Sequence, residues 1–343
     1  MKKCLLAVLF FAFTHGIALA DQDSQLMQAE EDPIFIITLG DSAAKGVWAD
    51  SSLGAPGAGF YWSAFLSSVE SSLLKRIFGY DHAYSPLQGA RDHIQEIERL
   101  FGHVAREGLS GLAGKQDYSL PVRIAEHTSR KTKVLNASFL AASYTTSSLA
   151  INKIDRFYKK HPFHIKPQAV FISYNGMDFM FEETLMDFQA SVNSLLKEID
   201  KRFPDTQIIV TELVDMVSIL TNRDQLAIPS GVLLEAHYCS DVYDRIGFGK
   251  RHNLSPGKTG AHVEMHRRKI NKMNQILASE IASFKQSWQA AGETKKIDLV
   301  PTVTHSDWAP YLAADCLHPN KDGQKLISDE IWKKVIELNL FGQ

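Results

Sequence analysis

Cysteine is scarce in this chain, and stretches long and apolar enough to cross a bilayer are missing beyond its first residues. Three cysteines occur in 343 residues. A membrane span needs about 20 consecutive apolar residues, and no later stretch meets that requirement. We therefore expect no transmembrane segment in the mature chain. The sequence also lacks an internal repeat and a low-complexity linker, so a single domain with insertions is expected.

The N-terminus has the pattern of an export signal. It begins Met1-Lys2-Lys3, residues 5–13 are apolar, and Ala18-Leu19-Ala20 has the small-x-small spacing of a signal-peptidase site. Cleavage after Ala20 would make the protein secreted or periplasmic. The alternative, an uncleaved anchor, is disfavoured because the apolar stretch is short and no stop-transfer flank follows. Residues 21–33 are polar and acidic and predict a flexible lead-in to a domain over 34–343.

An excess of basic charge is also missing. The 37 Lys and Arg fall to 35 when Lys2 and Lys3 leave with the signal peptide, against 39 Asp and Glu, so the mature chain carries a formal charge of −4. A nucleic-acid-binding surface requires concentrated basic charge. No nucleic acid is therefore expected as a partner.

Cleavage of the signal peptide also removes one of the three cysteines. Cys4 leaves, and Cys239 and Cys316 remain as an even pair in a chain bound for an oxidising compartment. We expect a disulfide between them, which on the chain-entropy estimate would stabilise the fold by about 4 kcal/mol. The alternative is two separate buried thiols.

Apolar β-branched runs alternate with amphipathic stretches along the chain. The expected strands are 34–39, 133–137, 169–173, 207–212 and 296–300. The expected helices are 61–76, 91–106, 146–160, 185–202, 263–290 and 321–338. This alternation predicts an α/β fold of three layers, α/β/α, with a mostly parallel five-stranded sheet and helices on both faces. Catalytic groups then belong on loops at the carboxyl ends of the strands.

Two segments interrupt the alternation. Residues 108–121 contain three glycines and predict a surface loop. Residues 229–260 are too long for an ordinary connection, and such segments are often lids or binding loops. Disorder is the alternative interpretation of this second insertion.

A serine follows the first strand directly. Gly40-Asp41-Ser42-Ala43 comes after the apolar run that ends at Leu39. A serine at a strand exit can present its hydroxyl at the carboxyl edge of the sheet, which makes Ser42 a candidate nucleophile. A hydroxyl at its free pKa is a poor nucleophile, so it needs a base and a group that orients the base.

The C-terminal part of the chain supplies both groups. In Asp315-Cys316-Leu317-His318-Pro319, an acid stands three residues before a histidine. The carboxylate can bind Nδ1 of the same imidazole, which leaves Nε2 free to face a serine. Alone, this pair also fits an aspartate that caps a turn beside a surface histidine. Together with Ser42 it predicts a Ser-His-Asp triad.

These motifs resemble the GDSL or SGNH hydrolase family. The match consists of Gly40-Asp41-Ser42 after the first strand, Asp315-x-x-His318-Pro319 before the last helix, and an asparagine loop after the third strand. It covers nearly the whole mature chain in order. The resemblance implies an SGNH hydrolase-like, flavodoxin-like sheet, with Ser42 as nucleophile, His318 as base and Asp315 as the group that orients the base.

The family's oxyanion donors are a serine N–H, a glycine N–H and an asparagine side chain, which this chain matches only partly. Ser42 N–H is the first donor, and Asn175 in Ser173-Tyr174-Asn175-Gly176 matches the amide, although Asn-Gly also favours a plain turn. The second motif lacks its glycine, and Ala141 is the nearest substitute for a backbone donor. Asp178 is expected to cap the following helix.

The resemblance further implies a secreted serine esterase without a cofactor. Similarity to secreted phospholipases and acyltransferases favours lipid esters as substrates, with water or an alcohol releasing the acyl group and transient contact with a membrane surface. A carbohydrate O-acetylesterase with the same triad is the alternative. A non-catalytic binding protein on the same scaffold is a second alternative, and the presence of Ser42, Asp315 and His318 together argues against it.

One further pattern points to a metal but is too weak to accept. His262 and His266 lie four residues apart on an expected helix, on the same face. The glutamate between them is displaced from the zinc-protease spacing, and no third ligand is marked. A solvated helix face explains the pair better, so no metal is expected.

Overall fold

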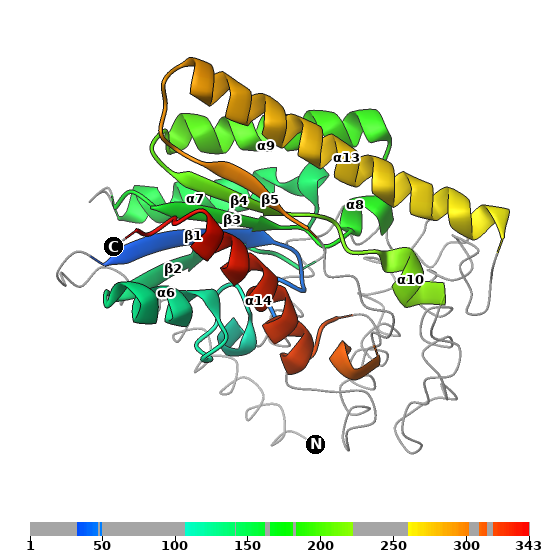
Figure 1. The fold of residues 1–343 in the computed structure, drawn as a ribbon, viewed down its shortest axis with the longest axis horizontal. Helices are drawn as coiled ribbons and strands as arrows, with labels where there is room; N and C mark the ends of the chain where they lie inside the picture. Colours follow the sequence, from blue (N-terminus) through cyan, green and yellow to red (C-terminus); the bar gives the residue numbers. More distant parts are fainter. Residues whose placement is uncertain are drawn as a thin grey trace, which may run out of the picture.

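The computed structural model describes residues 33–46, 49, 107–140, 142–161, 165–180, 183–221, 260–301, 309–313 and 318–342. At its centre lies a five-stranded sheet in the order β2-β1-β3-β4-β5 (Figure 1). Its strands are β1 (Ile34–Gly40), β2 (Thr132–Asn136), β3 (Ala169–Ser173), β4 (Gln207–Thr211) and β5 (Ile297–Val300). All four pairings are parallel, so the expected α/β fold is confirmed.

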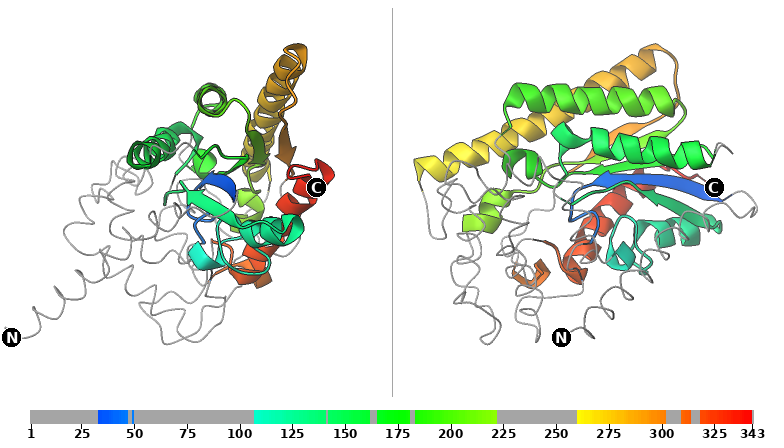
Figure 2. Two further views of the ribbon diagram at one scale, coloured as in Figure 1. Left: turned by 90° about the vertical axis from the view of Figure 1, so that its left-hand side faces the viewer. Right: turned by 180° about the vertical axis from the view of Figure 1, so that it is seen from behind.

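Helices cover both faces of this sheet (Figures 1 and 2). One face carries α7 (Ser148–Lys160), α9 (Leu185–Arg202) and α13 (Ala261–Ala290). The other carries α6 (Leu120–Thr128) and α14 (Lys321–Glu337). The shorter elements are α8 (Met177–Met180), α10 (Met216–Thr221), and the 3-10 helices η2 (Glu107–Leu109), η3 (Tyr144–Thr146) and η4 (Ala309–Tyr311).

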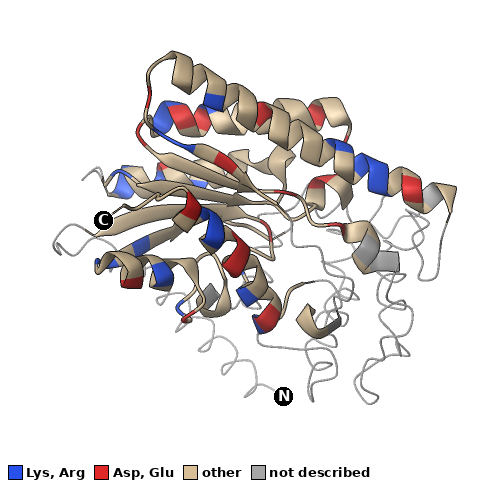
Figure 3. Cartoon of the chain, viewed as in Figure 1, with Lys and Arg blue, Asp and Glu red and all other residues tan. Residues whose placement is uncertain are grey.

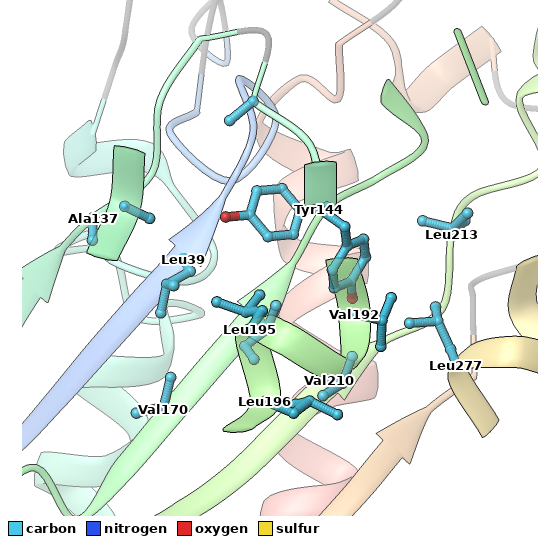
Figure 4. Packing of buried hydrophobic residues seen from close by; sticks show 14 of the residues in the cluster. Leu39, Ala137, Tyr144, Val170, Val192, Leu195, Leu196, Val210, Leu213 and Leu277 are labelled. Atoms are coloured by element: carbon cyan, nitrogen blue, oxygen red, sulfur yellow. The ribbon is translucent and has the colours of Figure 1, made fainter. Parts of the chain in front are cut away.

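The period of two along β1 explains the layers. Phe35, Ile37 and Leu39 point into the core under α7, α9 and α13, whereas Ile34 and Ile36 point into the core under α6 and α14. All five side chains are fully buried. A strand with both faces covered reads as one continuous apolar run, as this strand does. Figure 4 shows the larger core, where side chains of the sheet meet those of α9 and α13.

Charged residues of both signs are interspersed along the outer helices (Figure 3). On α14, Lys325 lies 2.8 Å from Asp329, and on α13, Arg268 lies 3.3 Å from Glu264. Such exposed pairs contribute little to stability, so the cores between the layers hold the fold together. None of the described helices is both long and apolar enough to cross a membrane.

The first predicted insertion differs from its expectation. Residues 108–121 were predicted as a surface loop, but Ser110, Leu112, Tyr118 and Leu120 are buried. The segment leads into α6, a helix of 9 residues that begins with a proline in its first turn and packs on β2. The predicted helices 61–76 and 91–106, the signal peptide and residues 229–259 lie outside the described residues.

The strand order creates a topological switch point between β1 and β3. From β1 the chain passes to β2 on one side and then returns to β3 on the other side. The loops after β1 and β3 therefore diverge, and ligands of open α/β sheets bind at this switch point. In the register of the sheet, Gly40 stands beside Ser173, so Ser42 and Asn175 follow neighbouring strand ends.

Candidate active site

The turn after β1 holds Ser42. Gly40 cannot be replaced there without a clash, because a Cβ atom would lie 2.4 Å from the Ser173 carbonyl oxygen and 2.4 Å from the Ala44 Cβ. Among the described residues, the only positive φ angles outside glycine are those of Ser129 and Asn339. Ser42 therefore does not adopt the left-handed backbone conformation, and 9% of its surface is exposed.

Polar side chains from distant segments fix this turn. Gln324 on α14 donates to the Ala43 carbonyl at 2.8 Å, and its own oxygen accepts from Gly111 N–H at 3.0 Å. Ser110 Oγ donates to the Ala44 carbonyl at 2.7 Å. Because all these groups are buried, the hydrogen bonds satisfy backbone groups that water cannot reach.

Replacing Gln324 with leucine is expected to lower the free energy of unfolding by about 2 to 4 kcal/mol, because two buried backbone groups lose their partners. Gln324→Glu keeps an acceptor for Gly111 but sets a buried carboxylate oxygen against the Ala43 carbonyl, so it should also be destabilising. Urea unfolding measures both changes. Lys325→Ala on the exposed side of the same helix is the control, and a Gln324→Leu effect as small as that control would contradict the account.

His318 reaches the turn from the other end of the chain. Residues 311–313 run antiparallel to residues 318–320, with Ala313 N–H donating to the His318 carbonyl at 2.7 Å and Asn320 N–H donating to the Tyr311 carbonyl at 2.9 Å. Asn320 then caps α14 by accepting from Gly323 N–H at 3.0 Å. This frame holds His318 at the start of α14.

The structure brings Ser42 and His318 together. His318 Nε2 lies 2.5 Å from Ser42 Oγ, although the two residues are 276 positions apart in the sequence. This is hydrogen-bonding distance for a general base and the hydroxyl that it deprotonates. A neutral imidazole that accepts this proton at Nε2 carries its own proton on Nδ1.

Asn175 lies beside the same turn but contacts Asp41. Its backbone N–H donates to Asp41 Oδ2 at 2.7 Å, and its Nδ2 donates to Asp41 Oδ1 at 3.0 Å. A second Nδ2 contact, with the Ser173 carbonyl, is longer at 3.4 Å. The side-chain amide is thus anchored at one N–H, and its other N–H has only a weak partner.

Asp41 is itself buried, with 3% of its surface exposed. Its Oδ1 also accepts from Ala43 N–H at 3.0 Å and Ala44 N–H at 3.4 Å. Burial raises the pKa of Asp41, and the hydrogen bonds from Asn175 and the charge of His318 oppose that rise. Asp41 is a site residue that the motifs did not identify; an aspartate at the start of a turn is the signal that could have found it.

The second predicted oxyanion loop follows β2 along the edge of β1. Ala137 N–H donates to the Thr38 carbonyl at 2.7 Å and Phe139 N–H donates to the Gly40 carbonyl at 3.1 Å. The chain therefore passes the end of β1 just before residue 141. Ala141 itself lies outside the described residues, and so do Asp315, Cys316 and Cys239.

Asp178 does not cap the helix that follows it, so that prediction is wrong. The N-cap of α9 is Thr184, whose hydroxyl accepts from Asp187 N–H at 3.1 Å. The Asp178 carboxylate accepts from Tyr144 N–H at 2.9 Å and Thr145 N–H at 3.1 Å, at the start of η3. Burial and the charge of Glu183 raise the pKa of Asp178 to about 7.

Packing explains one of the two histidines that suggested a metal site on α13. The His266 ring stands edge-on to the Phe179 ring, with centroids 5.6 Å apart. The His262 side chain is outside the described part of the chain. Among the side chains that are described, no group of three or more His, Cys, Asp or Glu could hold a metal ion.

Comparison with known proteins gives one family match. The model of the family described as GDSL-like Lipase/Acylhydrolase matches residues 36–331. A search of curated proteins found no match.

Several solved structures resemble the chain at low identity. A family 3 carbohydrate esterase from Clostridium thermocellum is 11% identical, with a TM-score of 0.43, and the match covers 91% of this chain and 100% of that one. A family two carbohydrate esterase from the same organism is 12% identical, with a TM-score of 0.42 and coverages of 91% and 67%. The psychrotrophic esterase EstA from Pseudoalteromonas sp. is 13% identical, with a TM-score of 0.37 and coverages of 88% and 97%.

Proposed function

The chain belongs to the family of GDSL-like lipases and acylhydrolases and is an ester-hydrolysing enzyme, and from this premise we propose that it cleaves lipid esters with a triad of Ser42, His318 and Asp315. The observation that carries the proposal is the 2.5 Å contact between His318 Nε2 and Ser42 Oγ. A serine becomes nucleophilic when a neighbouring base removes its proton.

The proposed reaction has two halves. Ser42 Oγ attacks the ester carbonyl carbon while its proton passes to His318 Nε2, and the same proton then goes to the departing alcohol. The acyl group remains on Ser42 as an ester. Water, deprotonated by His318, attacks this ester, and the bond to Ser42 Oγ breaks as His318 returns the proton to that oxygen, which releases the carboxylic acid. Asp315, three residues before His318, would accept from Nδ1–H and hold the ring for both steps.

The tetrahedral intermediates carry a negative oxygen that needs donors. We assign Ser42 N–H, the Asn175 side-chain amide and Ala141 N–H to this oxyanion hole. The nearness of Asn175 to the Ser42 turn supports its part, because the Asp41 carboxylate accepts from both the Asn175 side chain and the Ala43 N–H of that turn. A single donor of this kind typically changes kcat by a factor of about 10² to 10³.

The substrate and the compartment belong to the same proposal. The family description names lipases, which favours lipid esters and a transient contact of the enzyme with a membrane surface. The signal-peptide pattern and the even pair Cys239 and Cys316 favour an extracytoplasmic enzyme with a disulfide. An acetylated carbohydrate is the competing substrate.

A fluorophosphonate probe tests this proposal. We expect one covalent adduct on the exported protein, lost in Ser42→Ala, and an intact mass that fits cleavage after Ala20 and one disulfide. Hydrolysis of a phospholipid, a long-chain ester and an acetylated sugar is compared in parallel, and the lipid esters should be the faster substrates. Labelling that survives Ser42→Ala would contradict the nucleophile, and a preference for the acetylated sugar would contradict the substrate class.

A further inference from the structure

The Asp41 carboxylate touches both halves of the site. On one side it accepts from the backbone N–H groups of Ala43 and Ala44, at 3.0 and 3.4 Å, in the turn that carries Ser42. On the other it accepts from Asn175 twice, from the backbone N–H at 2.7 Å and from the side-chain Nδ2 at 3.0 Å. Asn175 stands 134 positions from Asp41 in the sequence, so the carboxylate joins two distant segments.

The chemistry of the two side chains determines how the Asn175 amide is turned. An ionised carboxylate only accepts hydrogen bonds, whereas an asparagine amide has an accepting oxygen at one end and a donating NH₂ at the other. Asp41 therefore binds the NH₂ end and repels the oxygen. With the amide in this orientation, its second N–H remains for a ligand, because the Ser173 carbonyl at 3.4 Å is a poor partner.

We propose that Asp41 is a positioning residue for ester hydrolysis, which turns the Asn175 amide so that an N–H faces the oxyanion and ties that amide to the Ser42 turn. The inference rests on the proposed function of Ser42 and Asn175. Asp41 itself does not touch the substrate. It acts through Asn175, as a fixed acceptor in a site where donors must be in place before charge develops.

The burial of Asp41 supports this role. A buried carboxylate without partners is costly, and here four N–H groups offset that cost. Burial raises the pKa of Asp41 while the Asn175 donors lower it, so the hydrogen bonds favour the ionised form, which is the form that accepts only. The alternative is that Asp41 merely caps the turn of Ser42 and has no effect through Asn175.

A double-mutant cycle separates these roles. Asp41→Asn replaces an oxygen by an NH₂ group, which must then face an Asn175 donor or one of the turn donors. We expect Asp41→Asn to lower kcat by a factor of about 10 to 100 with KM changed less than about threefold, and Asn175→Ala to lower kcat by about 10² to 10³. In the double variant, kcat should lie within about threefold of that of Asn175→Ala.

Glu280→Gln is the matched control. Glu280 is also a buried carboxylate with two amide partners, Gln189 Nε2 at 2.7 Å and Asn193 Nδ2 at 2.6 Å, but these contacts join α9 and α13. Its kcat should equal that of the unchanged enzyme. If Asp41→Asn lowers kcat by the same factor with and without Asn175, or leaves kcat unchanged, the positioning role is overturned.

A second measurement covers the case in which Asp41→Asn does not fold. In the unchanged enzyme labelled with ¹⁵N-asparagine, the Asn175 carboxamide signal is identified by its loss in Asn175→Ala. We expect one slowly exchanging proton on this amide, and rapid exchange of both protons would overturn the inference. If the unchanged enzyme showed no fluorophosphonate labelling that depends on Ser42, the proposed function would be overturned, and this role with it. The two failures are therefore distinguishable.

Discussion

Ser42→Ala and His318→Ala are each expected to lower kcat for ester hydrolysis by a factor on the order of 10⁴ to 10⁶, with no further loss when the two are combined. Without Ser42 there is no acyl acceptor. Without His318 no group receives the proton of Ser42 Oγ, because this oxygen lies 2.5 Å from His318 Nε2 in the unchanged enzyme. Both variants break the same step. Their effects on kcat should therefore coincide rather than multiply.

Steady-state kinetics of the two single variants and the double variant measure this effect, with circular dichroism to confirm that each is folded. His127→Ala is the control for loss of a histidine, because His127 lies on α6 with its ring 5.7 Å from that of Trp332, on the helical layer below the sheet. Its kcat should change less than about threefold. Multiplicative losses in Ser42→Ala and His318→Ala would show that the two residues act in separate steps, which contradicts the proposed pair.

The strands that carry the site could be predicted because their own residues are enough to indicate a buried strand. The run from Ile34 to Leu39 and the run of β3 are apolar and β-branched, and each is followed by a polar turn. The limits of β3 and α9 agree with the prediction to the residue. For α9, a Thr184 cap and a regular amphipathic pattern mark both the start and the face.

Features that depend on distant partners could not be predicted in this way. The segment before α6 is rich in glycine and has the composition of an exposed loop, but Gln324, more than 200 residues later, binds its Gly111 N–H and helps to bury it. Asp178 has the local sequence of a helix cap, and only the fold places its carboxylate against the N–H groups of η3. Local patterns identify capping residues, whereas the choice of helix end is a tertiary contact.

The site divides along the same line. Ser42 and His318 belong to short motifs whose chemistry indicates which groups they need as partners. The sequence could therefore predict that the two side chains lie together. The position of Asp41 between Ser42 and Asn175 follows from the alignment of Gly40 with Ser173 in adjacent strands, which no local pattern records. The contact of Asp41 with Asn175 therefore emerges only from the register of the sheet.

Asp178 is expected to make the enzyme less stable as the pH rises from about 4 to about 7. Its carboxyl group is fully buried, and burial, together with the nearby charge of Glu183, raises its pKa to about 7 from an ordinary value of 3.8. Between these values the folded protein holds the Asp178 proton and the unfolded chain does not. The free energy of unfolding is then larger at low pH and falls as the pH increases.

The difference between the folded and unfolded pKa values of Asp178 corresponds to a loss of unfolding free energy on the order of 4 kcal/mol between pH 4 and pH 7. The surroundings of Asp178 have opposing effects on its pKa. Burial and the charge of Glu183 raise the pKa, and the N–H groups of Tyr144 and Thr145 lower it. Urea unfolding of the unchanged enzyme and of Asp178→Asn, at pH values from 4 to 8, isolates the contribution of this group, because other titrating groups cancel in the difference.

Asp178→Asn cannot ionise, so the stability gap between the two proteins should change in favour of the variant as the pH increases. Glu183→Gln is the companion variant: it removes the neighbouring negative charge, so the pKa of Asp178 in the folded protein should fall, and the loss of stability should be smaller and end at a lower pH. A gap that stays constant from pH 4 to pH 8 would mean that the two N–H donors of η3 outweigh burial. Asp178 would then carry its charge throughout, as a fixed anchor between the loops after β2 and β3.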